Sequence, residues 1–304
     1  MSKNTTFFGQ PIFSQLINLI PRSKVDRLVK EYKSDHYCKK LDTFQHLITI
    51  LYGVVSGCNA LRELITGIVS YGHKISHCKF DYTPRRSTVS DANKRRSYTV
   101  FEAIYNALVK QYLPDLSDSH HRLFIDKKVY AIDSTTIKLF QPIFNCVGRN
   151  PINGKRKGGI KSHQKLDLQT GIPVKVYHSH ATEHDSLFIQ HQDVVNPGEI
   201  VLFDKAYNNY KQFAKWNESE INFVTRLKNN AQERLIEEFE LSPATPDNIL
   251  RDAKIALSYK DENNQDKEVE LRLVCFYHQE KNKVYYFLTN LFDLQPQQIA
   301  DLYK

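Results

Sequence analysis

The feature that most constrains the fold of this 304-residue chain is a change in hydrophobic periodicity after about residue 120. Before this point, apolar residues recur every three or four positions, as they do on one face of a helix. The clearest stretch runs from Phe44 to Val55, with Asp42 or Thr43 as its cap. From Lys128 on, short alternating or β-branched runs are typical of strands. We therefore predict a helical N-terminal domain over residues 1–120 and an α/β domain over residues 128–304.

The same patterns predict individual elements in both domains. Besides the stretch around Phe44, we expect helices over residues 60–69, 98–113, 185–192 and 207–216. We expect strands over residues 129–133, 160–168, 173–178, 200–203, 221–225, 253–259, 269–276 and 284–289. The last three strands follow a polar segment that contains Pro243 and Pro246, so they indicate a β-rich insertion at about 226–286.

The charge balance favours a polyanionic partner. The chain has 42 Lys and Arg against 34 Asp and Glu, which gives a net charge of +8 and a pI near 9.0. Basic residues gather in three short clusters, at 85–86, 94–96 and 155–157. Two interpretations of the basic helix near residue 90 stay open: a helix presented to DNA, or a solvated surface helix. On the first interpretation, the DNA contacts are Arg85, Arg86, Lys94, Arg95 and Arg96.

The cysteines and the hydropathy pattern exclude several classes of protein. Five cysteines without a C-x-x-C pair favour reduced, structural thiols over zinc or redox sites: Cys38, Cys58, Cys78, Cys146 and Cys275. No apolar run approaches the about 18 residues that a membrane-spanning helix needs. We therefore expect a cytoplasmic protein with access to the nucleoid and no membrane partner.

Two aspartates follow short apolar strands in the second domain. Asp133 comes after residues 129–132, and Asp204 comes after residues 200–203. If the two strands are neighbours, both carboxylates meet at one edge of the sheet. Two close carboxylates repel each other unless a divalent cation lies between them, and oxygen ligands favour Mg²⁺ or Mn²⁺. The alternative is that each aspartate is a turn residue or a helix cap, which is the commoner use of a single Asp.

Several segments that carry these aspartates resemble a known family. The segments 130–137 (YAIDSTTI), 158–163 (GGIKSH) and 204–207 (DKAY) are similar to the insertion-sequence-four group of DDE transposases. The resemblance extends, in the family's order, to residues 181–185, 223–226 and 287–290. Residues 20–23 and 86–93 are similar to the helical domain that often precedes the catalytic domain in these transposases.

The resemblance implies a ribonuclease-H-like core, which is a mixed sheet flanked by helices, with a β-rich insertion and an α-helical N-terminal domain. It implies Mg²⁺-dependent cleavage and strand transfer, with Asp133 and Asp204 as catalytic residues and metal ligands. The implied partner is double-stranded DNA, both at the inverted repeats of the element and at the target. The implied role of residues 1–120 is DNA binding.

The resemblance also implies a third acid, a Glu in a motif that starts with Tyr and continues through Arg. Tyr303 matches that first Tyr and is followed only by Lys304, so we expect the Glu to lie beyond the sequence and the catalytic domain to be C-terminally incomplete. Two functions follow from this expectation. One is a transposase that cleaves and joins DNA when complete; the other is a truncated, inactive DNA-binding relic or an inhibitor that assembles with an intact transposase. A nuclease of the same fold that does not join DNA ranks third.

Further DNA contacts are predicted near the two aspartates, each with a structural alternative. Lys161 and His163 could hold phosphate, although strand surfaces often carry such residues. Tyr207 could stack on a base, although aromatic stripes on helices more often pack against a sheet. Arg226 and Lys228 follow a strand and could hold the DNA backbone.

Overall fold

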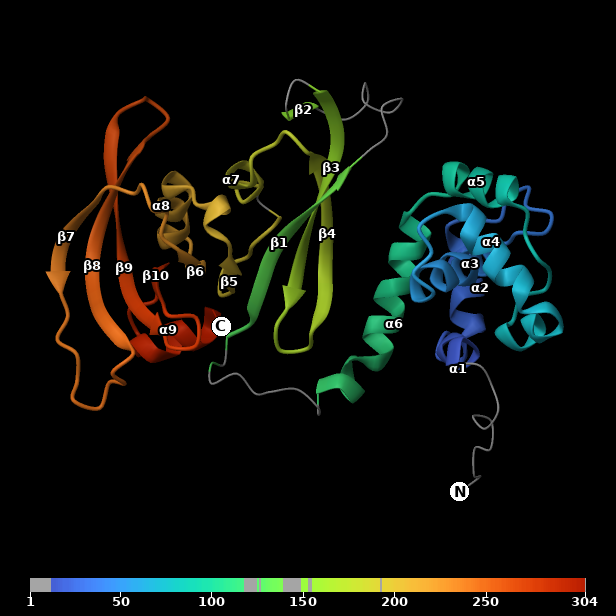
Figure 1. Ribbon diagram of the computed structural model, residues 1–304, viewed down its shortest axis with the longest axis horizontal. Helices are drawn as coiled ribbons and strands as arrows, with labels where there is room; N and C mark the ends of the chain where they lie inside the picture. Colours follow the sequence, from blue (N-terminus) through green and yellow to red (C-terminus); the bar gives the residue numbers. More distant parts are fainter. Residues whose placement is uncertain are drawn as a thin grey trace. The chain divides into compact units, whose positions relative to one another are not determined.

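The computed structural model describes residues 12–117, 125, 127–138, 149–152, 155–191 and 193–303. The chain divides into two compact units, Met1–Asp118 and Ser119–Lys304 (Figure 1). Cys146, Lys304 and the last residue of the helix expected over 185–192 lie outside the described residues. So do the side chains of the cluster at 155–157.

The first unit is helical, as the periodicity predicts. Its helices are α1 (Ile12–Asn18), α2 (Arg22–Glu31), α3 (Thr43–Val55), α4 (Leu61–Ser70), the 3-10 helix η2 (Gly72–Cys78), α5 (Arg86–Arg95) and α6 (Thr99–Ser117). The start of α3 is fixed by Asp42, whose carboxylate accepts the backbone N–H of Gln45 at 2.6 Å. Gly57 follows the end of α3 with a φ of +65, a conformation that glycine adopts without steric cost.

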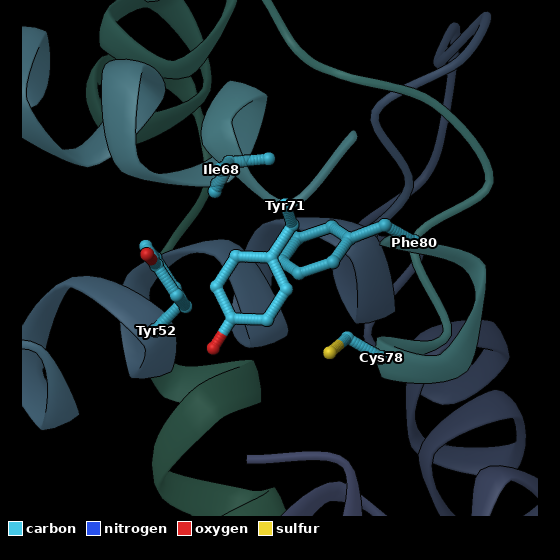
Figure 2. A pocket seen from close by; sticks show the side chains of 5 residues that line it. All are labelled: Tyr52, Ile68, Tyr71, Cys78 and Phe80. Atoms are coloured by element: carbon cyan, nitrogen blue, oxygen red, sulfur yellow. The ribbon is translucent and has the colours of Figure 1, made fainter. Parts of the chain in front are cut away.

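The core of the helical unit contains a small apolar pocket between its helices. The pocket is lined by Tyr52, Ile68, Tyr71, Cys78 and Phe80, whose side chains turn toward one another in Figure 2. The rings of Tyr52 and Tyr71 meet edge to face at 5.7 Å. Burial raises the pKa of the Cys78 thiol, which keeps it protonated and unreactive. The pocket is therefore part of the hydrophobic core.

The second unit is built on a mixed sheet that, within the described residues, has ten strands. They are β1 (Val129–Lys138), β2 (Arg149–Ile152), β3 (Lys155–Asp167), β4 (Ile172–His180), β5 (Ile200–Phe203), β6 (Asn222–Arg226), β7 (Glu233–Glu238), β8 (Ile249–Lys260), β9 (Asp266–His278) and β10 (Lys283–Thr289). The helical segments are α7 (Asp185–Phe188), the 3-10 turn η4 (Lys205–Tyr207), α8 (Tyr210–Glu218) and α9 (Pro296–Tyr303).

The strand order is β2-β3-β1-β5-β6-β10-β9-β8-β7, with β4 paired to β3. The central strands β1, β5 and β6 are parallel to one another, and all other pairs are antiparallel. This mixed sheet flanked by helices, preceded in the chain by a helical unit, confirms the predicted fold class. The strands predicted as a β-rich insertion extend the same sheet through β10 (Figure 1).

Helices cover both faces of the central strands. Phe203 of β5 lies in one buried cluster with Phe213 of α8. Its neighbour Leu202 points the other way and lies in a second cluster with Ile299 and Leu302 of α9. This follows from the alternation of side chains along a strand. The face covered by α8 and the face covered by α9 can therefore be told apart residue by residue.

Several predicted boundaries are wrong, each for a local reason. β1 does not end at Asp133, because pairing with β3 carries it on to Lys138. The helix expected from residue 207 begins at Tyr210, because the side chain of Asn209 caps it by accepting the Gln212 N–H at 3.1 Å. α7 spans only four residues, Asp185–Phe188.

Strand β7 was not expected, because all of its residues are exposed and its sequence has no alternating pattern. Among the described residues, the helices are all too short or too polar to cross a membrane.

Candidate active site

The register of the parallel strands brings the two predicted aspartates to neighbouring positions. Pairing between β1 and β5 ends with Ile132 opposite Phe203, so Asp133 and Asp204 are the next residue on each strand. Ile132 lies in the cluster under α8, so Asp133 projects from the opposite face. The backbone of Asp204 is still extended, with φ −70 and ψ 154, so its side chain also projects from the face covered by α9.

Burial and the charges of both carboxylates raise the pKa of two nearby tyrosines, Tyr303 and Tyr207. Burial is the largest cause that raises the pKa of Tyr303 of α9, and the charges of Asp204 and Asp133 raise it further. Burial likewise raises the pKa of Tyr207 above its usual value, with Asp133 and Asp204 among the further causes. Both carboxylates are thus near enough to the same two rings to affect their ionisation.

Asp204 is held in an ionised form by its neighbours. Burial raises the pKa of its carboxyl group, but the backbone N–H of Ala206 and the guanidinium of Arg226 outweigh burial and leave the pKa below its usual value. The Ala206 N–H lies 3.0 Å from Oδ1, and Arg226 pairs with Oδ2. Asp133 is exposed, and its Oδ1 accepts the backbone N–H of Ser134 at 2.8 Å.

Tyr303 fixes the end of α9 next to this pair. Its hydroxyl donates to the carbonyl of Phe203 at 3.1 Å, directly before Asp204. The guanidinium of Arg226 lies 5.8 Å from the centroid of the Tyr303 ring. Strand β6, strand β5 and helix α9 are thus joined at one point by Arg226, Asp204 and Tyr303.

The residues present fit a hard divalent cation as partial ligands. Asp133 and Asp204 offer carboxylate oxygens, and Mg²⁺ is commonly held by one or two carboxylates together with water and phosphate oxygens. In the described part of the chain, no group of three or more His, Cys, Asp or Glu side chains is arranged to hold a metal. Besides Asp133 and Asp204, a cation here would need further oxygen ligands, and it would compete with Arg226 for Asp204.

A buried polar network lies under the opposite face of the same strands. Lys161 of β3 donates to the Glu183 carbonyl at 2.7 Å and forms an ion pair with Asp185 at 3.1 Å. Ser134, the residue after Asp133, donates to the same Asp185 carboxylate at 3.2 Å. This network ties β1, β3 and the start of α7 together directly beside Asp133.

His163 and Tyr207 extend this network. His163 contacts the Tyr207 hydroxyl through Nδ1 at 2.9 Å and the Ser179 hydroxyl through Nε2 at 3.1 Å. Its ring stacks on Phe188 at 3.8 Å. Burial is the main cause that lowers the pKa of His163, so the ring is neutral at neutral pH. These contacts anchor the turn η4, which starts directly after Asp204.

The burial of three residues corrects their predicted role in DNA binding. Lys161 is 9% exposed, and His163 and Tyr207 are each 1% exposed. Side chains this deeply buried, with their polar atoms already paired, have no free face for phosphate or base. For Tyr207 the alternative interpretation, packing against the sheet, is the one that fits. Sequence cannot reveal this, because it does not say which strand face is covered.

The remaining residues predicted to contact DNA differ in their exposure and in whether they already have a polar partner. Arg226 pairs with Asp204, and the Lys228 ammonium donates to the Asn208 carbonyl at 3.2 Å. In the helical unit, Arg96 pairs with Asp35 at 3.1 Å and is largely buried. The exposed side chains on and next to α5 are Arg85, Arg86, Lys94 and Arg95. DNA binding by these residues remains a prediction.

Several residues in these contacts have no role assigned from sequence, and three of them surround the polar network and Lys228: Ser134, Glu183 and Asn208. Ser134 could have been suspected from its place next to Asp133 in a strand. The other two act through backbone carbonyls, for which sequence carries no signal.

Family comparisons agree with this architecture. Residues 125–304 match the family model described as "Transposase DDE domain", and residues 8–79 match one described as "Domain of unknown function (DUF4372)". Because the first model covers more than half of the chain, the chain belongs to the DDE transposase family.

Similar proteins include a Geobacillus stearothermophilus protein named "Probable transposase for insertion sequence element IS5377". It is 22% identical over 223 residues, which are 72% of this chain and 54% of the relative. The y4zB protein of Sinorhizobium fredii (strain NBRC 101917 / NGR234), which also carries a transposase name, is 26% identical over 183 residues, or 60% of this chain and 48% of its own. The chain thus spans about half the length of these relatives.

Among solved structures, a cryo-EM structure of the piggyBac transposase synaptic complex with hairpin DNA is similar with a TM-score of 0.38 and 12% identity. The similarity covers 95% of this chain and 64% of that one.

Proposed function

We propose that this transposase chain binds DNA and, with a divalent cation held by Asp133 and Asp204, takes part in phosphodiester cleavage and strand transfer. The observation that carries the proposal is the register of β1 and β5, which ends one residue before each aspartate. Two carboxylates on adjacent strands, each one residue past the last β1–β5 pair and on one face of the sheet, form a natural pair of ligands for one cation.

The chemistry divides between the cation and the protein. When bound, Mg²⁺ or Mn²⁺ would lower the pKa of an attacking water or 3′-hydroxyl and stabilise the charge on the leaving oxygen. The chain's own residues hold the ligands: Ser134 N–H fixes Asp133, and Ala206 N–H keeps Asp204 ionised. Arg226, beside Asp204, can donate to a phosphate oxygen in place of the carboxylate, because a guanidinium binds either anion in the same geometry.

The proposed partner is double-stranded DNA, at the inverted repeats of an element and at its target. The net charge of +8 and the exposed cations next to α5 support this choice. Assembly with a second copy, or with a longer transposase, is part of the same proposal, as is a location at the nucleoid.

Metal binding gives the first test. We expect electron paramagnetic resonance to detect Mn²⁺ bound to the intact chain, and we expect Asp133→Asn and Asp204→Asn each to weaken binding at least about ten-fold, because each removes a charged ligand. Asp247→Asn is the matched control, since Asp247 is exposed and far in sequence from both ligands. Unchanged Mn²⁺ affinity in both site variants would rule out the proposed site.

Activity on plasmid DNA separates the possible functions. With Mg²⁺ or Mn²⁺, joining of DNA ends supports the transposase function, whereas nicking alone supports a nuclease. A chain that binds DNA and Mn²⁺ but neither nicks nor joins would be a DNA-binding relic or inhibitor. In that case, adding it to an active relative should reduce the strand transfer of that relative.

A further inference from the structure

The helical unit contains a groove of about 970 Å³ that is separate from the core pocket. Two segments far apart in the sequence form its walls: residues 32–41, between α2 and α3, and residues 82–100, around α5. The first segment was not singled out by its sequence, because its lysines do not form a dense cluster. The groove therefore joins part of the basic cluster near α5 to cations that had no assigned role.

The walls of this groove carry positive charge without a balancing negative charge. Five of the lining residues are exposed cations: Lys33, Lys39, Lys40, Arg85 and Arg95. Within the described residues, none of these five forms an ion pair, and no Asp or Glu side chain lines the groove. A concave surface lined by one sign of charge concentrates the electrostatic field on whatever enters it, and here it attracts an anion.

A partly buried ion pair connects the two walls of the groove. Arg96, at the end of α5, pairs with Asp35 at 3.1 Å and also donates to the Leu41 carbonyl. Asp35 in turn accepts the backbone N–H of Thr43 at 2.7 Å, at the start of α3. Among the described residues of this wall, the arginine that forms an ion pair is thus the one that fixes the 32–41 segment. The groove is therefore formed before any ligand binds.

Tyr37 adds an exposed aromatic ring at the groove. Its side chain is 92% exposed, and its backbone has a φ of +59, in the left-handed region that non-glycine residues avoid. Its ring contacts the ring of the neighbouring His36, with the two centroids 4.0 Å apart. Bulky residues rarely adopt this conformation, so the surrounding fold holds Tyr37 in it. Such a ring, next to unpaired cations, is the arrangement that binds nucleic-acid bases by stacking.

We propose that this groove binds one strand of DNA, with phosphates on the five cations and a base stacked on Tyr37. The inference rests on the proposed function and deepens it, because it assigns a DNA site within the helical unit. The site needs no metal and uses neither Asp133 nor Asp204. Binding here can therefore be measured apart from any chemistry in the sheet unit.

The experiment is fluorescence anisotropy of the intact chain with a labelled single-stranded oligonucleotide and its duplex, in EDTA. The triple variant Lys33→Gln, Lys39→Gln, Lys40→Gln should bind about ten-fold or more weakly. Its salt dependence should also fall, by a slope of about 2 on single strands, since each lost phosphate contact removes about 0.7. Arg85→Gln with Arg95→Gln, on the other wall, should weaken binding in the same way.

The matched control removes three positive charges from the same unit outside the groove: Arg27→Gln, Arg62→Gln, Lys110→Gln. It should bind within about two-fold of the unmodified chain. Equal losses in the triple variant and the control would mean that only net charge matters and would overturn the proposal.

Tyr37→Asn tests the stacking contact while keeping a residue that tolerates positive φ. It should weaken single-strand binding about five-fold or more without changing the salt slope, because stacking is worth about 1–3 kcal/mol per base. Unchanged affinity would remove the base contact from the proposal.

The double variant Asp133→Asn with Asp204→Asn separates this proposal from the proposed function. It should bind DNA in EDTA at least as tightly as the unmodified chain, because it leaves the groove intact and removes two negative charges. If the groove variants also bind normally while the aspartate variants lose Mn²⁺, the groove proposal fails and the metal site stands. If the groove variants lose DNA but the aspartate variants keep Mn²⁺, the groove stands and the metal site fails.

Discussion

Basic side chains play different roles in the core of the sheet unit and at the groove of the helical unit. In the sheet unit, Arg272 is 4% exposed, and its guanidinium contacts both oxygens of Asp252, at 2.8 and 2.6 Å. In the helical unit, Lys33, Lys39 and Lys40 are exposed at the groove and lie outside the ion pairs found in the described residues. The first arrangement stabilises a fold, and the second leaves charge available to a ligand.

The difference shows that a basic residue in a sequence indicates DNA binding only where the fold gives it no acidic partner. Lys161 and Arg226 were predicted as DNA contacts, as were Arg85 and Arg95, on similar sequence grounds. The sheet gives the first two a carboxylate on a neighbouring element, Asp185 and Asp204. The comparison predicts large stability effects and small DNA-binding effects at the buried cations Lys161 and Arg272 of the sheet unit, and the reverse at the groove.

The largest expected effect is at Arg272. Arg272→Met should lower the free energy of unfolding by about 3–5 kcal/mol, because it leaves Asp252 buried without a partner. The only tryptophan, Trp216, is buried in the sheet unit, so its fluorescence during urea unfolding reports on this unit. The double variant Arg272→Met with Asp252→Leu should recover part of the loss, because the Leu291 and Leu294 carbonyls still lack the Arg272 donor. A loss below about 1 kcal/mol in the single variant would contradict the structural role assigned to this pair.

A smaller effect is expected at Lys161. Lys161→Met should cost about 2 kcal/mol, because the Asp185 carboxylate and the Glu183 carbonyl lose a donor. Lys175→Met is the control: its ion pair with Asp193 is exposed, so its loss should cost less than about 0.5 kcal/mol. The same urea titration measures both variants. Equal costs would mean that burial of the Lys161 pair is of no consequence.

The pH dependence of stability should reveal His163. Burial lowers the pKa of this ring below the usual value of 6.5, so the unfolded chain binds its proton more readily than the folded chain does. The free energy of unfolding should therefore fall as the pH drops below about 6.5, by at most about 1.4 kcal/mol per pH unit for this one group. His163→Gln should remove this part of the pH dependence. A variant with the same slope as the unmodified chain would assign the effect to other groups.

The smallest stability effect is expected at the groove. The triple variant of Lys33, Lys39 and Lys40 should change the free energy of unfolding by less than about 0.5 kcal/mol, because these side chains are exposed and outside the observed ion pairs. Circular dichroism suits this measurement, since the unit is helical. A loss above about 1 kcal/mol would mean that the lysines stabilise the fold, and the contrast between the units would not hold.

Sequence reasoning succeeded where local pattern decides the structure. The helix around Phe44 starts at Thr43 behind its cap Asp42, and the strand at 200–203 has the predicted bounds. Prediction from sequence was less accurate where strand pairing or packing between distant residues determines the structure. β1 runs past Asp133 because β3 continues beside it, and Tyr207 is buried because His163 and Phe188 close over it.

In the candidate site, too, some features could be predicted from sequence and others could not. A strand followed by an aspartate can be seen in sequence, so Asp133 and Asp204 could be proposed together. Their common face, the Arg226 contact and the polar network around Asp185 depend on register, which the sequence does not specify. The groove joins residues about fifty positions apart, which no local pattern connects.

The central claim is that Asp133 and Asp204 hold one cation between them, and cleavage of the protein by hydroxyl radicals from bound Fe²⁺ tests it most directly. Fe²⁺ in place of Mg²⁺, with ascorbate and peroxide, cuts the backbone near its own position, and mass spectrometry locates the cuts. We predict cuts near both residues 133 and 204, and the loss of both sets of cuts in Asp133→Asn as well as in Asp204→Asn. Cuts near only one residue, or cuts near one that persist when the other is changed, would contradict a shared cation.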